Sequence, residues 1–209
     1  MIDPLRVTNF ERTLHEAEEF LAFVILGAAK DSDRAAAATA DLLRGKPASL
    51  APYAWLRRLG RNRIAGRLVA SRFGQQHQKS KYLHGTAVLV ADRDVRDVRD
   101  VRDVREFKLA DLMPLPGLGM MTARMFPVHS RRDGPRHAVL DVMSLRVLRR
   151  RGVPRVPAQT LCSAREYLRL ERAWLRYCDR TGRHLAELDL EDCIRESSRP
   201  TPASPATSA

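Results

Sequence analysis

Residues 115–123 read Leu-Pro-Gly-Leu-Gly-Met-Met-Thr-Ala, and apolar residues with helical spacing lie on both sides of them. The two glycines, Gly117 and Gly119, permit a tight hairpin with positive φ angles. Such a hairpin leaves backbone N–H groups at the start of the following helix free to converge on an anion such as a phosphate. The segment therefore predicts two short helices, over residues 107–113 and 121–129, joined by this corner. A simple helical corner without a ligand is the alternative.

The rest of the chain also has helical patterns. Residues 10–29 form an apolar stretch dense enough for a buried helix, and Asp31-Ser32-Asp33 supplies N-cap residues for a helix over residues 34–43. Glycines at Gly60 and Gly74 are expected to end two of the later helices. These later helices are predicted over residues 53–59, 62–73, 141–151, 162–181 and 188–196. No stretch alternates as strands do, so the predicted fold class is all-α.

The charge balance favours a polyanionic partner. Lysine and arginine together number 37 against 25 aspartates and glutamates, which gives a formal net charge of +12. Arginine suits forked contacts with phosphate, although a codon bias towards arginine would give the same excess. Lysines, the residues able to act as amine nucleophiles, are few: Lys30, Lys46, Lys79, Lys81 and Lys108.

Composition also excludes several classes of protein. The three cysteines are too far apart for a metal-binding pair and too few for a disulfide framework, so we expect no metal and a reducing compartment. No secretory leader or membrane span is recognised, which predicts a soluble cytoplasmic protein. Residues 1–196 are expected to form a single catalytic unit. We expect an exposed insert at the Asp-Val-Arg repeat of residues 93–105, and a disordered tail over residues 197–209.

A second motif follows the hairpin. The apolar run Ala138-Val139-Leu140 leads into Asp141, which begins the helix predicted up to Arg151. The order and separation of the hairpin and this aspartate resemble the helix-hairpin-helix DNA glycosylase superfamily, which includes endonuclease III and the 8-oxoguanine glycosylases. The resemblance is strongest from Phe107 to Val153 and is absent in the tail.

This resemblance implies a two-lobed helical fold with the active-site cleft between the lobes. One lobe would be a helical barrel of about residues 18–136, and the other would combine residues 137–196 with the N-terminal segment. Asp141 would be catalytic: it would stabilise the oxocarbenium-like sugar and orient or deprotonate the nucleophile. A structural N-cap is the alternative role for Asp141. The hairpin residues implied to bind the DNA backbone are Leu115, Gly117, Gly119, Met120 and Thr122.

The implied partner is double-stranded DNA that contains a damaged or mismatched base, bound by a monomer associated with the nucleoid. Bifunctional members of the superfamily carry a lysine immediately before the threonine of the hairpin, whereas this chain has Met121. A thioether cannot form a Schiff base, so the substitution predicts a monofunctional enzyme that uses water, or an inactive relative. Lys30 matches a loop whose side chain enters the gap left by a flipped base, and an ordinary lysine at a helix end is its alternative.

No cofactor is expected, because the cysteines lack the close spacing that binds an iron–sulfur cluster in some endonuclease III relatives. The polar, basic segment 75–82 is a further candidate for contact with DNA. Two other functions stay open at this point: a non-catalytic module that uses the hairpin to bind DNA, and an RNA-associated basic protein. The sequence does not identify the base that would be excised.

Overall fold

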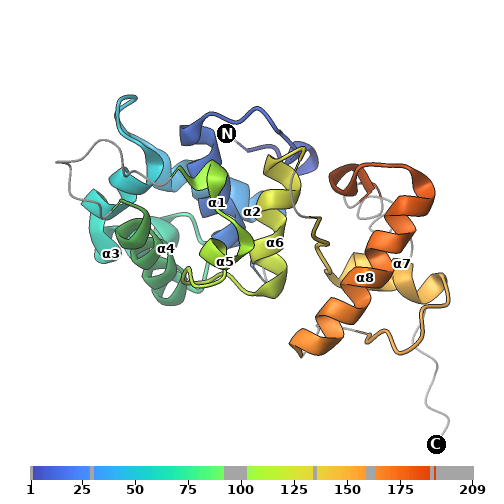
Figure 1. Cartoon of the computed structure of the whole chain (residues 1–209). Coiled ribbons are helices and arrows are strands. Elements are labelled where there is room, and N and C mark those ends of the chain that lie inside the picture. Colours follow the sequence, from blue (N-terminus) through green and yellow to red (C-terminus); the bar gives the residue numbers. More distant parts are fainter. Residues whose placement is uncertain are drawn as a thin grey trace, which may run out of the picture. The chain divides into compact units, whose positions relative to one another are not determined.

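The computed structural model describes residues 2–28, 31–91, 103–133, 136–158, 163–188 and 191. All regular elements in these ranges are helical (Figure 1), which confirms the predicted all-α class. The chain divides into two compact units, unit 1 (Met1–His137) and unit 2 (Ala138–Ala209). Each unit is described by itself.

Helix α1 (Leu14–Gly27) forms the centre of unit 1. Every side chain from Phe20 to Leu26 is at most 1% exposed, as expected for a helix that is apolar on all sides. Other helices of the unit pack around α1. The elements of unit 1 besides α1 are η1 (Pro4–Arg6), α2 (Ser32–Leu43), α3 (Pro52–Ala70), α4 (Gln76–Ala91), η2 (Val104–Glu106), α5 (Leu109–Leu112) and α6 (Met120–Ser130).

The helix boundaries follow the local sequence signals. Asp31 caps α2, because its Oδ1 accepts a hydrogen bond of 3.1 Å from the Arg34 amide. This confirms the N-cap predicted at the start of that helix. Gly60 has φ 72° and ψ 160°, so α3 is two helical segments joined by a kink at the glycine that was predicted to end the first.

Helix α4 was not predicted along its full length. Its polar start, within residues 75–82, was interpreted as a solvated helix start and a candidate contact with DNA. In the structure Lys79 is 3% exposed, and its ammonium donates to the carbonyl oxygens of Ile25 at 2.7 Å and Ala28 at 2.9 Å. The lysine thus donates to carbonyl groups at the C-terminal end of α1, where the last carbonyl groups of a helix receive no hydrogen bond from its own N–H groups.

The N-terminal segment belongs to unit 1, which corrects its assignment to the second lobe. The amide of Asn9 donates to the His129 carbonyl of α6 at 3.0 Å, and the Thr8 hydroxyl lies 2.8 Å from His129 Nδ1. Arg12 is buried, donates to the same carbonyl at 2.6 Å and stacks over the ring of Phe20. These contacts with α6 place the segment in the core of unit 1.

The end of the Asp-Val-Arg repeat is also part of this core. The structure describes residues 103–105 of the repeat, and Val104 is fully buried at 0% exposure in η2, which packs against α1. Asp103 caps this turn and pairs with Arg105. The prediction of an exposed insert is therefore wrong for this end of the repeat, and residues 93–102 lie outside the described residues.

Unit 2 contains α7 (Val142–Arg150) and α8 (Ala164–Thr181), followed by a helical turn over residues 185–188. Gly182 closes α8 with φ 65°, the left-handed conformation typical of a helix C-terminus. The buried face of α8 carries Tyr167, Leu170, Trp174, Tyr177 and Cys178. Most of the predicted helix 188–196 and the predicted tail, residues 197–209, lie outside the described residues.

Candidate functional site

The hairpin between α5 and α6 is a hydrogen-bonded turn. The Leu118 amide donates to the Leu115 carbonyl at 3.1 Å, and Gly117 at the third position of the turn has φ 86°. Pro116 at the second position and glycine at the third are the residues that a type II turn favours. The predicted tight corner is confirmed, and Gly117 supplies its positive φ.

Helix α4 packs directly against this turn. A Cβ atom on Gly117 would lie 2.6 Å from Tyr82 Cδ2, and one on Gly85 would lie 3.1 Å from the Pro116 ring. The Thr86 hydroxyl donates to the Pro116 carbonyl at 3.4 Å. Glycine is therefore required at position 117 for two reasons: its backbone conformation and the aromatic ring that covers it.

Gly119 differs from Gly117, and the sequence prediction of a positive φ is wrong there. Its φ is −100°, which any residue adopts, and a Cβ would meet no atom within 4 Å. Its amide donates to Thr122 Oγ1 at 2.8 Å, so this N–H is already engaged. Amides able to meet an anion at the start of α6 are those of residues 120–122, since the first amides of a helix lack partners within it.

The side chains predicted to bind DNA differ in their exposure. Leu115 is 7% and Thr122 is 5% exposed, so both support the hairpin from inside. Met120 and Met121, the first two residues of α6, are half-buried. Lys30 lies outside the described residues.

Asp141 is the N-cap of α7, as predicted. Its Oδ1 accepts hydrogen bonds from the Ser144 amide at 2.8 Å, and the Ser144 hydroxyl lies 2.6 Å from the same oxygen. The Asp141 amide donates back to the Ser144 hydroxyl at 3.1 Å. These reciprocal bonds hold the half-buried carboxylate at the N-terminus of α7.

Helix α8 fixes the extended backbone that leads into Asp141. The Tyr167 hydroxyl donates to the Ala138 carbonyl at 2.8 Å and accepts from the Leu140 amide at 3.2 Å. One turn later, Glu171 accepts from the Ala138 amide at 2.9 Å. Both side chains are buried, at 3% and 6% exposure. Sequence reasoning missed this pair as site residues, although a tyrosine and a glutamate four apart on an otherwise apolar helix face were a detectable signal.

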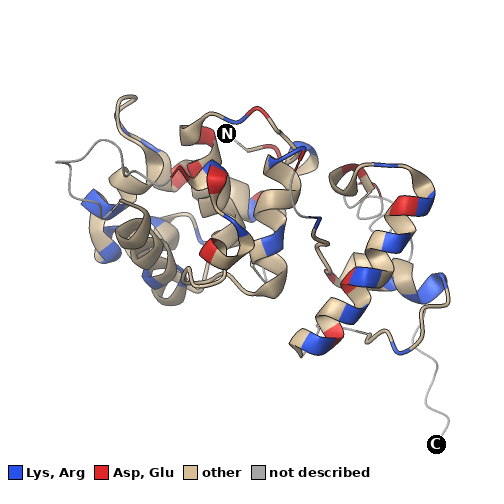
Figure 2. Ribbon diagram, in the orientation of Figure 1, with Lys and Arg blue, Asp and Glu red and all other residues tan. Residues whose placement is uncertain are grey.

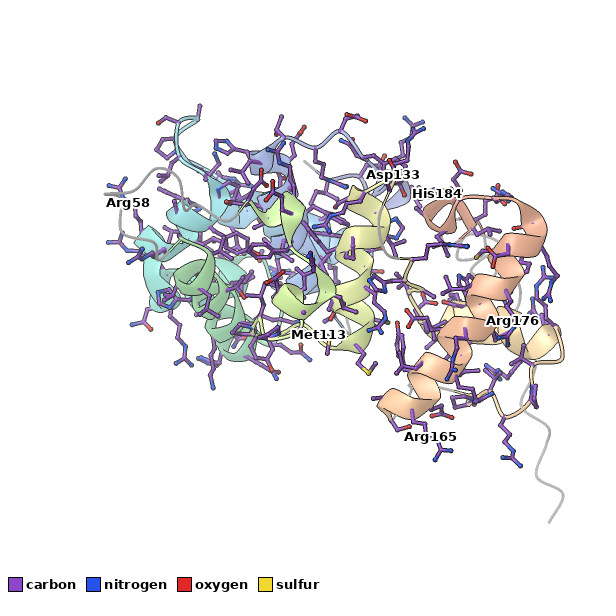
Figure 3. All side chains as sticks on the ribbon, in the orientation of Figure 1. Arg58, Met113, Asp133, Arg165, Arg176 and His184 are labelled. Carbon is purple, nitrogen blue, oxygen red and sulfur yellow. The ribbon has the colours of Figure 1, made fainter. Side chains whose placement is uncertain are left out.

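The predicted site residues fall into two groups. The hairpin residues lie together in unit 1, whereas Asp141 and its supporting side chains lie in unit 2. Figure 3 shows the side chains of both groups of helices, with Met113 labelled at the end of α5. The active-site cleft between two lobes stays a prediction.

Within the described ranges, no three histidine, cysteine, aspartate or glutamate side chains gather closely enough to hold a metal ion. None of the helices in the described part of the chain is both long and apolar enough to cross a membrane.

Two solved structures resemble the whole chain. A Methanocaldococcus jannaschii 8-oxoguanine glycosylase/lyase in complex with a 15mer DNA containing 8-oxoguanine has a TM-score of 0.65 and 18% sequence identity, with 93% of this chain and 88% of that chain covered. The 8-oxoguanine DNA glycosylase of the same organism has a TM-score of 0.66 and 18% identity, with 94% and 86% covered. This chain has the fold of these DNA glycosylases. No family model matches the sequence, and no curated protein matches it.

The resemblance predicted from the hairpin and Asp141 is thus confirmed at the level of the fold. At 18% identity, the likeness to these structures shows a shared fold. The roles of individual residues therefore rest on the geometry of this chain.

Proposed function

We propose that the protein is a DNA N-glycosylase of base excision repair, which binds duplex DNA, flips a damaged base out of the stack and hydrolyses its glycosidic bond. The observation that carries the proposal is the combination of a phosphate-compatible hairpin and a helix-capping aspartate, Asp141, on a DNA glycosylase fold. Both similar structures are described as 8-oxoguanine glycosylases, so 8-oxoguanine is the first substrate to test.

Asp141 would act on the sugar. As the bond between C1′ and the base nitrogen breaks, its electron pair leaves with the base and positive charge develops on the sugar, where a carboxylate stabilises it. Water then adds to C1′, and the carboxylate accepts the proton that the water loses; this proton passes through solvent to the departed base, which leaves Asp141 ionised again. Ser144, together with Tyr167 and Glu171, holds Asp141 and the backbone before it, so the carboxylate needs little reorganisation during the reaction.

Met121 determines the expected products. A covalent glycosylase/lyase needs an amine to attack C1′, and the second residue of α6 offers a thioether instead. We therefore propose a monofunctional reaction that leaves an intact strand with an abasic site.

A panel of duplexes tests the proposal. Each duplex carries one lesion or mismatch, with 8-oxoguanine, uracil, alkylated adenine and an adenine mismatch represented. Base release is followed with and without subsequent alkali, and parallel reactions contain borohydride. We expect one or more lesions to give strand breaks only after alkali, with little covalent complex trapped.

The other outcomes are equally informative. If no lesion is released while the protein still binds duplex DNA, the non-catalytic binding module is correct and the glycosylase proposal fails. Efficient borohydride trapping would overturn the monofunctional mechanism and would mean that a lysine outside the hairpin position acts as the amine.

A further inference from the structure

Helix α8 carries a row of arginines on one side. Successive arginines of the row are four, three, four and four residues apart. With about 3.6 residues per turn they lie on the same side of the helix, and the row extends for about 22 Å. Figure 2 shows basic residues recurring along α8, and Figure 3 labels two of the side chains, Arg165 and Arg176. The arginine row consists of Arg165, Arg169, Arg172, Arg176 and Arg180.

The row faces away from the core of unit 2. The buried residues of α8, among them Tyr167, Trp174 and Cys178, occupy the opposite side of the helix, while four members of the row are exposed. Arg169 is the exception. It is half-buried and donates to the carbonyl oxygens of Pro154 at 2.9 Å and Arg155 at 2.7 Å, so it has a structural role.

Among the described residues, no carboxylate forms an ion pair with Arg165, Arg172, Arg176 or Arg180. The buried acid of α8, Glu171, is occupied by the Ala138 amide. Among the described residues Asp179 is an exposed acid on the same side of α8, so this side carries a clear excess of positive charge without being free of acid.

Such a row has an energetic cost. Like charges three or four residues apart on a helix repel each other by about 0.2–0.5 kcal/mol per pair. An external polyanion removes this repulsion, and guanidinium groups offer it forked, permanently charged donors. One turn of helix separates successive arginines by about 5.4 Å, which is short enough for several of them to meet consecutive phosphates.

We propose that the arginine row is a contact surface for the phosphodiester backbone of duplex DNA, in addition to the hairpin of unit 1. The inference rests on the proposed function in one respect, that the polyanion is taken to be DNA. Contacts to phosphate carry no direct information on base sequence, so the contact would be independent of base sequence. It would supply salt-dependent affinity.

Two triple variants of the full chain test this surface. R172Q/R176Q/R180Q removes three charges from the row, and R58Q/R61Q/R63Q removes three exposed charges from α3 as a matched control. Glutamine keeps a helix propensity close to that of arginine. Binding to an undamaged duplex is measured by fluorescence anisotropy between about 50 and 200 mM salt.

We expect the α8 variant to bind at least tenfold more weakly at about 100 mM salt and to lower the slope of log K against log salt by roughly 2–3. The α3 variant loses the same number of charges from a helix outside the row, so it should bind within about twofold of wild type if affinity depends on the row and not on net charge alone. Equal losses in the two variants would mean that only net charge matters, and an unchanged α8 variant would likewise overturn the proposal. If the α8 triple variant does not fold by circular dichroism, R165Q and R176Q are measured singly, each with a slope change of about 1 expected.

Two further arms separate DNA from other polyanions and this inference from the proposed function. The affinities of wild type and of the α8 variant are also measured for single-stranded RNA and for vesicles with anionic lipid. If the variant loses more affinity for either of these than for the duplex, the assignment to DNA is overturned. If wild type releases no base but the row still controls duplex binding, the proposed function fails and this inference stands. If excision occurs while the α8 variant binds as wild type does, this inference alone fails.

Discussion

The hairpin and the segment that leads into Asp141 are fixed by different kinds of interaction. In the hairpin, the shape depends on steric fit: Gly117 in a left-handed conformation lies against the ring of Tyr82. At Asp141, the shape depends on buried hydrogen bonds that the backbone of residues 138–140 makes with Tyr167, as donor and acceptor, and with Glu171 as acceptor. A candidate phosphate contact needs only backbone amides in the right place, whereas a candidate catalytic carboxylate has to be held in one orientation.

This difference predicts how the two regions respond to substitution. Changes in the hairpin should reduce stability or affinity, because they alter a packed turn. Changes around Asp141 should reduce the rate of base release, because they alter the placement of one carboxylate. The following predictions test that division.

The largest effect is expected for Asp141→Asn. Asparagine is as good an N-cap as aspartate, so the free energy of unfolding should change little. The rate of base release should fall by about 10²–10⁴-fold, because the sugar loses its stabilising negative charge and the water loses its base. Single-turnover kinetics on a lesion duplex measure the rate, and anisotropy with the same duplex checks that binding is retained. If the Asp141→Asn variant binds the duplex poorly but releases the base at the normal rate once it is saturated with DNA, Asp141 acts in binding and the proposed difference between the two regions is wrong.

A pair of glycine variants should separate steric fit from DNA contact. Gly117→Ala places a methyl group against Tyr82 and strains a positive φ, so we expect a loss of about 2–4 kcal/mol in the free energy of unfolding. Gly119→Ala meets open space at a φ of −100°, so its stability should stay within about 0.5 kcal/mol of wild type. Urea unfolding gives both values.

The same pair reports on phosphate contact. If DNA approaches the start of α6, the exposed methyl group of Gly119→Ala should weaken duplex binding several-fold while the fold stays intact. Normal binding by this variant would show that the backbone of DNA does not come close to position 119.

Glu18, like Glu171, is a buried carboxylate that accepts a backbone N–H, and Glu18 gives a prediction that depends on pH. Glu18 accepts from the Tyr53 amide at 2.8 Å, and desolvation by burial raises the pKa of Glu18 to about 7. Because the folded pKa lies above the unfolded value, stability should fall as pH rises through the range between about 4.5 and 7. Glu18→Gln removes this ionisation, so its stability should not fall in this range. The free energy of unfolding of the variant minus that of wild type should therefore be about 2 kcal/mol larger at pH 8 than at pH 5. Urea unfolding at the two pH values checks the sign, and an equal difference at both would contradict it.

A smaller effect on the rate of base release is expected for Tyr167→Phe than for Asp141→Asn. The change leaves the Leu140 amide and the Ala138 carbonyl without the tyrosine hydroxyl, at a cost of about 1–2 kcal/mol. Base release by the saturated variant should slow by about tenfold, because the backbone before Asp141 becomes less fixed. The substitution of Tyr177, another buried tyrosine of α8, by phenylalanine is the control and should leave the rate unchanged. A loss of stability with no loss of rate would confine Tyr167 to a structural role.

Much of this fold was predictable because its signals are local. Asp31 and Asp141 cap helices through their own side chains, and Gly60 and Gly117 break or turn the chain where a positive φ is needed. These features depend on neighbours in the sequence, so the sequence alone contains the information.

Helix α4 was not predictable in the same way, because its pattern of burial contradicts its residue types. It buries Lys79, Ser80 and Thr86, while Leu89 is 60% exposed. Only the packing of α4 against α1 and the hairpin explains this pattern. The support of Asp141 by Tyr167 and Glu171 depends in the same way on how α8 lies along residues 138–140; the sequence marks the two polar side chains on the apolar face of α8 but not the backbone groups that they bind.

One consequence follows from the position of α4. Within a single turn of this helix, Lys79 grips the carbonyl groups at the end of α1 and Tyr82 covers Gly117 of the hairpin. One turn of α4 therefore holds both the C-terminal end of α1 and the hairpin in place. If the end of α1 shifted, the buried contacts of the Lys79 ammonium would break, and if the hairpin shifted, the ring of Tyr82 would have to move. A displacement of the hairpin by bound DNA would therefore reach the end of α1 through α4.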